Sequence, residues 1–199
     1  MAKAMSGQMI VTPSAEGIAA SVKAAKGRGL PPVHLWNPPF CGDLDMRIAR
    51  DGTWFYQGTP IGRPGLVRLF STILRKDGDK YFLVTPVEKV GITVDDAPFL
   101  AVDFDVSGTG RDQKLTFHTN VGDTVTAAPE TPLRFVRDPD TGEPSPYIMV
   151  RAGLEALIDR KSFYRLADLG TEHVVDGSPW FGIWSDGAFF GMIPTADLP

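Results

Sequence analysis

Apolar residues recur with helical spacing in residues 63–74, and this is the clearest element that the pattern predicts. The apolar positions i, i+3, i+4 and i+7 are Leu66, Leu69, Phe70 and Ile73. This spacing places them on one face of a helix. Pro64 suits the first turn, where a backbone N–H has no partner within the helix. We therefore predict an amphipathic helix that packs its apolar face on a sheet.

Alternating apolar and polar residues predict strands through most of the remaining chain. Residues 45–61 have the pattern of a hairpin around Asp51-Gly52, and residues 180–193 that of a second hairpin around Asp186-Gly187. Asp-Gly is a strong signal for a two-residue hairpin turn. Further strands are expected at residues 81–84, 92–95, 99–106, 115–119, 124–128, 133–136 and 147–150.

Two more segments near the amino end have recognisable patterns. Residues 14–26 predict a short helix, with Ser14 as N-cap and Gly27 after its last turn. Residues 31–39 contain four prolines, which are excluded from helix interiors and central strands. We expect an extended strap held by Trp36, which either anchors the chain to the body or shapes the wall of a cleft.

A second amphipathic helix is predicted from Leu154, Leu157 and Ile158, continuing through Phe163. The start of this predicted helix overlaps the motif R-x-G-L-x-x-L at residues 151–157, which also occurs at residues 63–69. A second pair of similar strings, I-x-x-D-G-x-aromatic-F, begins at Ile48 and at Ile183. These echoes indicate two related structural units that face each other across a junction.

The predicted fold class is therefore α+β, with two small β-rich units from an internal duplication, each an antiparallel sheet with a packed helix. We expect a flexible terminus with a short helix at residues 1–30, an amino-terminal unit at 31–89 and a carboxy-terminal unit at 90–199. The boundary is placed at Lys89-Val90-Gly91. Junctions between units are common places for binding clefts.

Composition narrows the class of protein. The net charge of -4 argues against a dedicated nucleic-acid binder, which usually has a basic face. Cys41 is the single cysteine, so an intrachain disulfide and a cysteine-based zinc site are both excluded. Residues 1–11 lack the apolar run of a secretory signal, and no stretch approaches the roughly 18 apolar residues of a membrane span. We expect a cytoplasmic protein.

A search for catalytic motifs finds none that is specific. His34, His118 and His173 are far apart and follow no metal-ligand pattern. The Gly108-Thr109-Gly110 string is followed by residues with the periodicity of a strand. A dinucleotide-binding loop would be followed by a helix, so this string is not interpreted as one. Carboxylates at residues 95, 96, 103 and 105 lack the glycine-interrupted loop of an EF-hand. We expect no catalytic residue, metal or cofactor.

Several strings spread along the chain resemble the DUF1285 family of uncharacterised bacterial proteins. They are W-N-P-P-F-C-G at 36–42, D-G-x-W at 51–54, T-P-V-E-K at 85–89, V-D-D-A-P-F at 94–99, R-A-G-L at 151–154 and W-S-D-G at 184–187. The resemblance implies a two-part α+β fold with an internal duplication and a second part superficially like a pleckstrin-homology domain. It also implies a ligand site in the cleft between the parts and a role in signal transduction, with no established enzyme activity.

The first functional hypothesis is a non-enzymatic module that binds an unidentified small molecule or protein in the cleft between the units. The expected cleft residues are Arg63, Thr85, Glu88, Lys89, Asp95, Asp96, Phe99 and Arg151. The two arginines occupy matching positions in the echoed strings, and they are expected to pair with Glu88 or Asp96 across the junction. The alternative is that these charges form only an internal ion-pair network.

The second hypothesis is an enzyme that acts on a small polar metabolite at the same junction. Asp96, Glu88 or His173 would then serve as the acid or base. This alternative requires titratable groups that converge in one pocket.

Overall fold

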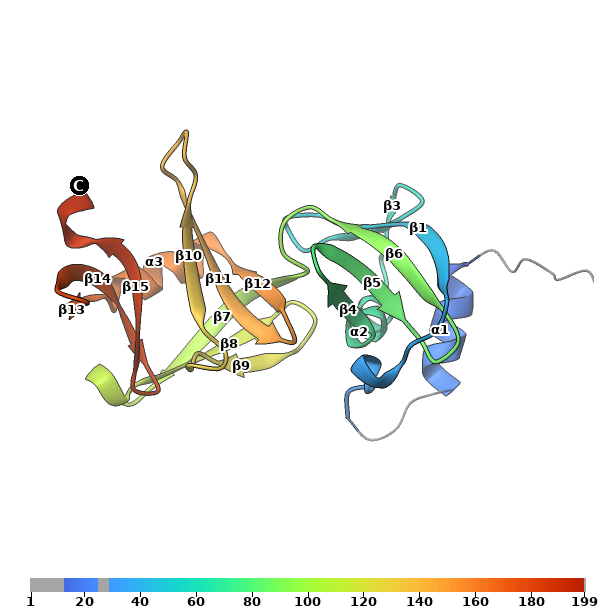
Figure 1. Ribbon diagram of the computed structural model, residues 1–199, viewed down its shortest axis with the longest axis horizontal. Helices are drawn as coiled ribbons and strands as arrows, with labels where there is room; N and C mark the ends of the chain where they lie inside the picture. The colour runs from blue at the N-terminus through green and yellow to red at the C-terminus, as the bar shows by residue number, and fades with distance from the viewer. Residues whose placement is uncertain (1–12, 25–28, 199) are drawn as a thin grey trace, which may run out of the picture.

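The protein is elongated, with two β-rich units side by side along its long axis (Figure 1). The computed structural model describes residues 13–24 and 29–198, and in these ranges it contains fifteen strands, three α-helices and three short 3-10 helices. Helix α1 (Ala15–Ala24) lies at the outer end of the first unit, and a small third sheet lies at the outer end of the second. None of the helices in the described ranges has the length and apolar character required to span a bilayer.

The first unit is built on a six-stranded sheet with the order β3-β2-β1-β6-β5-β4. Its strands are β1 (Phe40–Ile48), β2 (Trp54–Tyr56), β3 (Thr59–Pro60), β4 (Leu74–Asp77), β5 (Lys80–Val84) and β6 (Lys89–Val94). The central pair, β1 and β6, is parallel, and all other neighbours are antiparallel. The sheet therefore consists of two three-stranded meanders joined through their inner strands.

The second unit has a six-stranded sheet with the order β10-β11-β12-β7-β8-β9. Its strands are β7 (Phe99–Ser107), β8 (Lys114–Thr119), β9 (Thr124–Thr126), β10 (Leu133–Arg137), β11 (Pro144–Arg151) and β12 (Leu154–Ile158). Again the inner pair, β7 and β12, is parallel and the others are antiparallel. Counted within its own unit, each sheet has the strand order 3-2-1-6-5-4.

The predicted helix at residues 63–74 is confirmed as α2 (Pro64–Thr72), with Pro64 in its first turn. Its Phe70 is fully buried, and the ring stacks on Trp54 with centroids 6.3 Å apart. The helix expected at residues 14–26 is α1, and the Ser14 hydroxyl accepts a hydrogen bond from the Gly17 amide at 3.1 Å. Gly27, expected to follow its last turn, lies outside the described residues.

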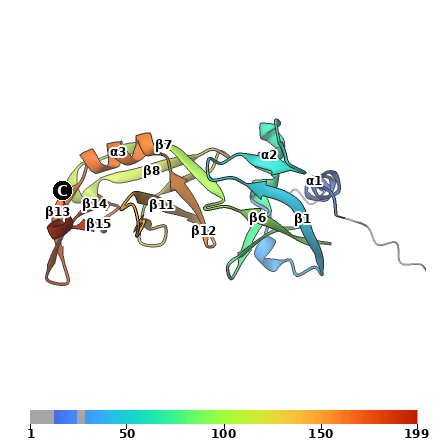
Figure 2. The same ribbon diagram turned by 90° about the horizontal axis from the view of Figure 1, so that it is seen from above.

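The second predicted helix is wrong for residues 154–158, which form strand β12. The apolar residues at 154, 157 and 158 match helical spacing, but Leu154, Ala156 and Ile158 are the buried ones, with the period of two that marks a strand. The helix begins after them, as α3 (Arg160–Asp168), where the Asp159 carboxylate caps the Ser162 amide at 2.8 Å. Figure 2 shows α3 lying over one face of the second sheet.

The echoed strings do not mark equivalent elements. Residues 63–69 lead into helix α2, whereas residues 151–157 form a turn and strand β12. Asp51-Gly52 joins β1 to β2, as predicted, and Asp186-Gly187 joins β14 (Ser178–Ser185) to β15 (Ala188–Pro194) of the third sheet. Within the shared strand order the counterpart of the β1–β2 turn is the β7–β8 connection, which lacks the Asp-Gly string.

The change from the first sheet to the second falls between Val94 and Phe99. Strand β6 pairs with β1 and β5 of the first sheet, so it extends beyond the boundary expected at Lys89-Val90-Gly91. The third sheet has the order β13-β14-β15, with β13 at Thr171–Val175. The buried Ser185 hydroxyl on β14 donates to the Ala127 carbonyl at 2.7 Å and accepts from the Leu115 amide at 3.0 Å, which ties the third sheet to the second.

The proline segment is anchored to the first unit. A short 3-10 helix (Val33–Leu35) interrupts the expected extended strap. One guanidinium nitrogen of Arg75 donates to the Val33 carbonyl at 3.1 Å and to the Trp36 carbonyl at 2.7 Å. The Trp36 side chain is half-buried against the core. These contacts favour the anchoring interpretation.

Close packing of the third sheet leads to a test of the fold. A Cβ atom at Gly182 would overlap the Phe190 carbonyl oxygen and would lie 2.9 Å from Gly191 Cα. Because backbone atoms cannot yield as a flexible side chain can, we expect Gly182→Ala to lower the free energy of unfolding by about 1–3 kcal/mol. Urea denaturation measures this change.

Gly65 provides the matched control, since nothing lies within 4 Å of a Cβ atom there and the residue is helical. Gly65→Ala should raise the free energy of unfolding by up to about 1 kcal/mol. Equal effects of the two substitutions would contradict the packing seen at Gly182.

Candidate functional site

A pocket of about 550 Å³ lies where the two units meet. Its volume falls within the roughly 300–1,000 Å³ typical of small-molecule sites. The first unit supplies Arg50 and Asp51 from the β1–β2 turn. The second unit supplies Leu100, Glu143, Pro144, Ser145, Pro146, Leu157, Ile158, Asp159, Arg160, Phe163 and Tyr164. Both units are therefore required to complete the walls.

The apolar part of the pocket is built on the parallel inner pair of the second sheet. Leu100 of β7 and Leu157 of β12 are partners across that pair. Each is half-buried, whereas its sequence neighbours on the same strand point into the core. Phe163 adds an aromatic ring from α3, and this ring also packs near Phe135 with centroids 6.4 Å apart. The outer face of the sheet thus presents an apolar surface that is not part of the main core.

Arg50 connects the two units at the rim of the pocket. Its Nε lies 3.2 Å from Asp96 Oδ2, and its Nη2 donates to the Ser145 hydroxyl at 2.9 Å. Tyr147 donates its hydroxyl proton to Asp96 Oδ1 at 2.8 Å. Burial, and then the bond to Asp96, raises the pKa of Tyr147 above its usual value, so the phenol stays protonated as a donor. We call this group of four residues the Arg50 network.

Two further arginines cross the junction in opposite directions. Arg151 of the second unit pairs with Asp123, donates to the Ser71 carbonyl of the first unit at 2.8 Å and lies 4.8 Å from the centre of the Phe99 ring. Arg68 of the first unit donates to the Val121 carbonyl of the second at 3.0 Å. These contacts fix the second unit against α2.

Asn120 adds a contact next to the pocket. Its side-chain amide donates to the Gly52 carbonyl at 3.2 Å and accepts from the Leu100 amide at 3.0 Å. Gly52 has a φ of 83°, and a Cβ atom there would lie 2.6 Å from the Asn120 amide nitrogen. The glycine of the first Asp-Gly turn therefore serves both the turn and the close approach of the two units.

The structure divides the expected cleft residues into two groups. Asp96, Phe99 and Arg151 lie at the junction, and Asp95 follows the same end of β6 but forms an exposed pair with Arg47 at 2.9 Å. The remaining expected residues are Arg63, Thr85, Glu88 and Lys89. None of the eight lines the pocket itself.

The second group lies away from the junction. Lys89 starts β6, at the opposite end from Asp95, and it pairs with Asp77 at 2.7 Å and covers the Phe82 ring at 4.1 Å. The buried Thr85 hydroxyl accepts from the Glu88 amide at 3.1 Å and holds the turn between β5 and β6. Arg63 is exposed before α2. These residues have local structural roles.

The expected cross-junction pairing needs a correction. Asp96 pairs with Arg50 rather than with Arg63 or Arg151, and Arg151 pairs with Asp123. Sequence reasoning missed Arg50, Ser145 and Tyr147, although Arg50 directly precedes an Asp-Gly turn that it had found. No motif connects them because their convergence depends on the contact between the units.

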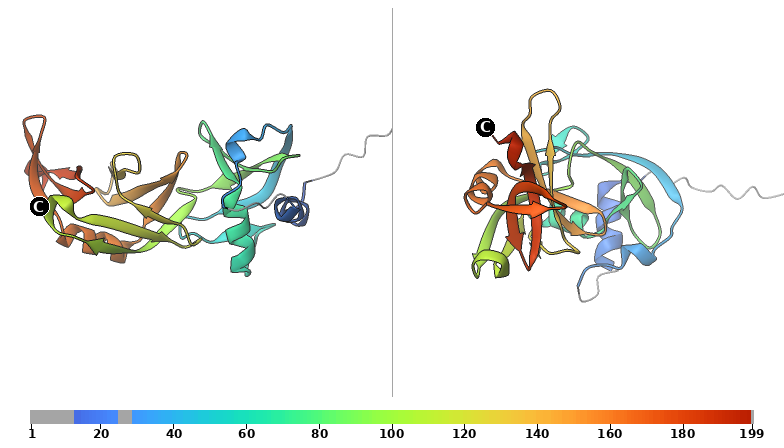
Figure 3. Two further views of the ribbon diagram at one scale, coloured as in Figure 1. Left: turned by 90° about the horizontal axis from the view of Figure 1, so that it is seen from below. Right: turned by 60° about the vertical axis from the view of Figure 1, so that its left-hand side comes forward.

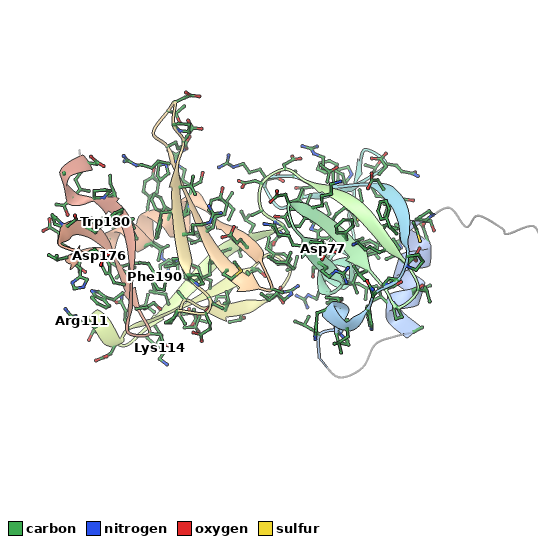
Figure 4. The ribbon with its side chains drawn as sticks, viewed as in Figure 1. Asp77, Arg111, Lys114, Asp176, Trp180 and Phe190 are labelled. Atoms are coloured by element: carbon green, nitrogen blue, oxygen red, sulfur yellow. The ribbon has the colours of Figure 1, made fainter. Side chains whose placement is uncertain are left out.

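The three residues of the enzyme hypothesis do not share a site. Glu88 lies at the far end of β6, and Asp96 belongs to the Arg50 network. His173 lies on the third sheet, where its ring is 4.8 Å from that of Trp184 and 5.0 Å from that of Phe189. Figure 4 labels Trp180 and Phe190 on this sheet, at the end of the molecule remote from the first unit.

Two of the three carboxylates that line the pocket have local partners. Asp51 accepts from the Thr53 amide at 2.9 Å, and this bond holds the pKa of the Asp51 carboxyl below its usual value. Asp159 caps α3 through Ser162. Within residues 13–24 and 29–198, no group of three or more His, Cys, Asp or Glu side chains is placed to hold a metal ion.

Comparison with known proteins identifies the family. Two family models match adjoining parts of the chain, the amino-terminal domain of unknown function DUF1285 over residues 31–97 and the carboxy-terminal domain of the DUF1285 proteins of unknown function over residues 98–192. The chain belongs to the DUF1285 family. The junction between the two matches coincides with the change of sheet between β6 and β7. No curated protein matches the chain significantly.

A solved structure of a DUF1285 protein supports the assignment. A crystal structure of a family member from Silicibacter pomeroyi DSS-3 is 64% identical, covers 91% of this chain and 97% of that one, and superimposes with a TM-score of 0.82. A crystal structure of a family member from Shewanella baltica OS155 is 29% identical and covers 63% of this chain and 91% of that one, with a TM-score of 0.49.

Arg151 and Arg47 provide a matched test of the junction. Each pairs with one aspartate, but the Arg151 side chain is more buried than that of Arg47. The Arg151 side chain is 21% exposed and the Arg47 side chain 51%. Arg151→Gln leaves Asp123 and the Ser71 carbonyl without their donor, and we expect a loss of about 1–3 kcal/mol in the free energy of unfolding. Arg47→Gln should change it little, because exposed pairs contribute little. Similar losses from both substitutions in urea denaturation would refute the role of Arg151.

Glu88 gives a test with a defined pH dependence. Burial raises the pKa of its carboxyl above the usual value. The folded protein then holds this proton more tightly than the unfolded chain. The contribution of Glu88 to stability is therefore present below the unfolded pKa of about 4.3, is lost as pH rises through the folded pKa, and stays lowered at neutral pH. We expect Glu88→Gln to raise the melting temperature at pH 7 and to change it little at about pH 4. A lower melting temperature at pH 7 would mean that the carboxylate makes a favourable contact.

Proposed function

We propose that this protein is a non-enzymatic binding module that takes a small ligand in the pocket between its two units. The observation that carries the proposal is a concave site whose walls come from both units, with apolar side chains on one side and guanidinium groups at the rim. We also propose a role in signal transduction, because a ligand in this pocket would contact both units and could change how they interact.

The Arg50 network links occupancy to the contact between the units. Arg50 lines the pocket and at the same time pairs with Asp96 and Ser145. A ligand that binds the Arg50 guanidinium competes with these partners or strengthens their alignment, and either effect changes the free energy that holds the units together. We propose that this coupling is the signal that the module passes on.

We also propose that the two units arose by internal duplication. The support is the common strand order 3-2-1-6-5-4 with a parallel inner pair in both sheets. The likeness of the second unit to pleckstrin-homology domains has weaker support, namely a run of short strands followed by α3. Such a likeness would not transfer phosphoinositide binding. A cytoplasmic location remains part of the proposal and is based on the single cysteine.

The enzyme alternative has no comparable support, because Glu88, Asp96 and His173 lie in three different places. A protein partner is the competing occupant. It is favoured only if small molecules fail to bind.

A thermal-shift screen with a pocket-filling variant tests the proposal. A ligand at about a hundred times its dissociation constant stabilises the folded state by roughly 2.7 kcal/mol, which corresponds to about 5–10 °C for a chain of this size. We expect a hit among small metabolites whose shift disappears in Leu157→Trp, where the indole fills the space beside Leu100.

Val106→Trp is the control, since Val106 is an exposed residue at the far end of the strand that carries Leu100 and does not line this pocket. Its melting curve should shift with the ligand as the unsubstituted protein does. A hit that survives Leu157→Trp would place the ligand elsewhere, and a screen without hits would favour a protein partner.

A further inference from the structure

We infer that the ligand of the junction pocket is an amphipathic anion, with an apolar body against Leu100, Leu157 and Phe163 and a carboxylate, sulfonate or phosphate head between Arg50 and Arg160. This inference rests on the proposed function, because it names the class of ligand for the same pocket. Its support comes from the separation of apolar and basic groups around the walls.

The apolar body has a defined place in the pocket. Leu100 and Leu157 lie side by side across the parallel strands, and Phe163 of α3 faces the same space. Pro144 and Pro146 of β11 add two rigid rings at its edge. Burying apolar surface there contributes about 25 cal/mol per Å². A purely polar metabolite would leave this surface without a partner.

The head group has two guanidinium donors. Arg50 forms an ion pair with Asp96 and donates from Nη2 to the Ser145 hydroxyl, and its Nη1 has no partner among the described residues. Arg160 uses Nε for the Tyr164 hydroxyl at 3.2 Å, and both of its terminal nitrogens are without partners in the same described part of the chain. Guanidinium groups with free N–H pairs bind carboxylate, sulfonate and phosphate oxygens in a fork geometry.

The position of α3 adds to this preference. Arg160 is the first residue of the helix, and Asp159, Arg160, Phe163 and Tyr164 all line the pocket. The first amide groups of a helix have no acceptor within it, and the helix dipole is positive at this end. An anion in the pocket therefore meets two arginines beside the first turn of α3, where the Ser162 amide is already capped by Asp159.

Three acidic residues also line the pocket, and two of them are committed elsewhere. Asp51 accepts from the Thr53 amide within its own turn, and Asp159 accepts from the Ser162 amide. Glu143 lies in the loop between β10 and β11, where it is exposed to solvent and its charge acts on Arg160. Figure 3 shows this hairpin projecting beyond the sheet. The guanidinium groups and the Glu143 carboxylate are thus the polar groups of the pocket without a hydrogen-bond partner among the described residues, and an anionic head group competes with Glu143 for Arg160.

Two fluorescent probes with one skeleton test the inference. Anilinonaphthalenesulfonate carries a sulfonate, and phenylnaphthylamine is the same molecule without it. We expect the sulfonate to bind with a stoichiometry of one and with an affinity at least about fivefold higher than the neutral probe, as expected for a charge-assisted hydrogen bond to arginine. Added salt should weaken the sulfonate more than the neutral probe.

Variants assign the affinity to the pocket. Arg160→Gln should reduce sulfonate affinity about fivefold and leave the neutral probe unchanged, and Arg160→Lys should retain part of the affinity. Leu157→Trp should weaken both probes. Arg111→Gln is the control, because Arg111 lies over Trp184 at the remote end of the second unit (Figure 4).

The possible outcomes separate the two proposals. Equal binding of both probes, with no effect of Arg160→Gln but a loss in Leu157→Trp, would overturn the anionic head and keep the pocket as a ligand site. A loss in Arg111→Gln alone, or no binding of either probe, would overturn the pocket as the site. Octanoate should displace the sulfonate probe if the ligand is a free anion. Sedimentation of the protein with phosphatidylglycerol vesicles but not with phosphatidylcholine vesicles, without displacement by octanoate, would overturn the free source in favour of a lipid headgroup.

Discussion

The contact between the two units depends on arginine side chains that find their acceptors in the opposite unit. Arg68 binds the Val121 carbonyl, Arg151 binds the Ser71 carbonyl, and Arg50 bridges Asp96 and Ser145. A hydrophobic interface would be tolerant of small shifts, because the hydrophobic effect has no direction. Hydrogen bonds to backbone carbonyls are directional, so they fix the register of the two units and with it the shape of the pocket.

Within each unit the inner parallel pair imposes a second constraint. Two neighbouring parallel strands require a long connection between them, and in both sheets that connection consists of the four other strands. In the first unit α2 forms part of this path, whereas in the second unit residues 127–132 make a short loop there. The same strand order is thus compatible with different helices packed on the sheet. Helices α1 and α2 belong to the first unit and α3 to the second, and they follow different strands.

The sequence predicts the local structure of the protein better than its assembly. The Asp51-Gly52 and Asp186-Gly187 hairpins and the helix beginning at Pro64 follow from residues that are neighbours in the chain. The error at Leu154 arose because its apolar residues fit both a period of two and a period near 3.6, and only the pairing with β7 and β11 decides between them.

The candidate site was less accessible to sequence reasoning for a related reason. Asp96 and Arg151 lie at the junction, but their partners there are not the ones that the sequence suggested. Arg50, Tyr147 and Asp123 are distant in the chain, and nothing in their immediate neighbours distinguishes them from other exposed charges or from a strand tyrosine. Lys89 and Asp95 are close in the chain, yet strand β6 holds them at its opposite ends.

A pocket lies beside the inner parallel pair of each unit, and the two pockets have different walls. In the first unit a pocket of about 370 Å³ is lined by residues of β1, β5 and β6 and of the turn before β5, Thr93 and Lys80 among them. In the second unit the pocket is walled by α3 and by the β1–β2 turn, neither of which lines the pocket of the first unit. The second unit without the first would keep the apolar residues of the pocket and lose Arg50 from its rim. The complete site therefore requires both units in one chain.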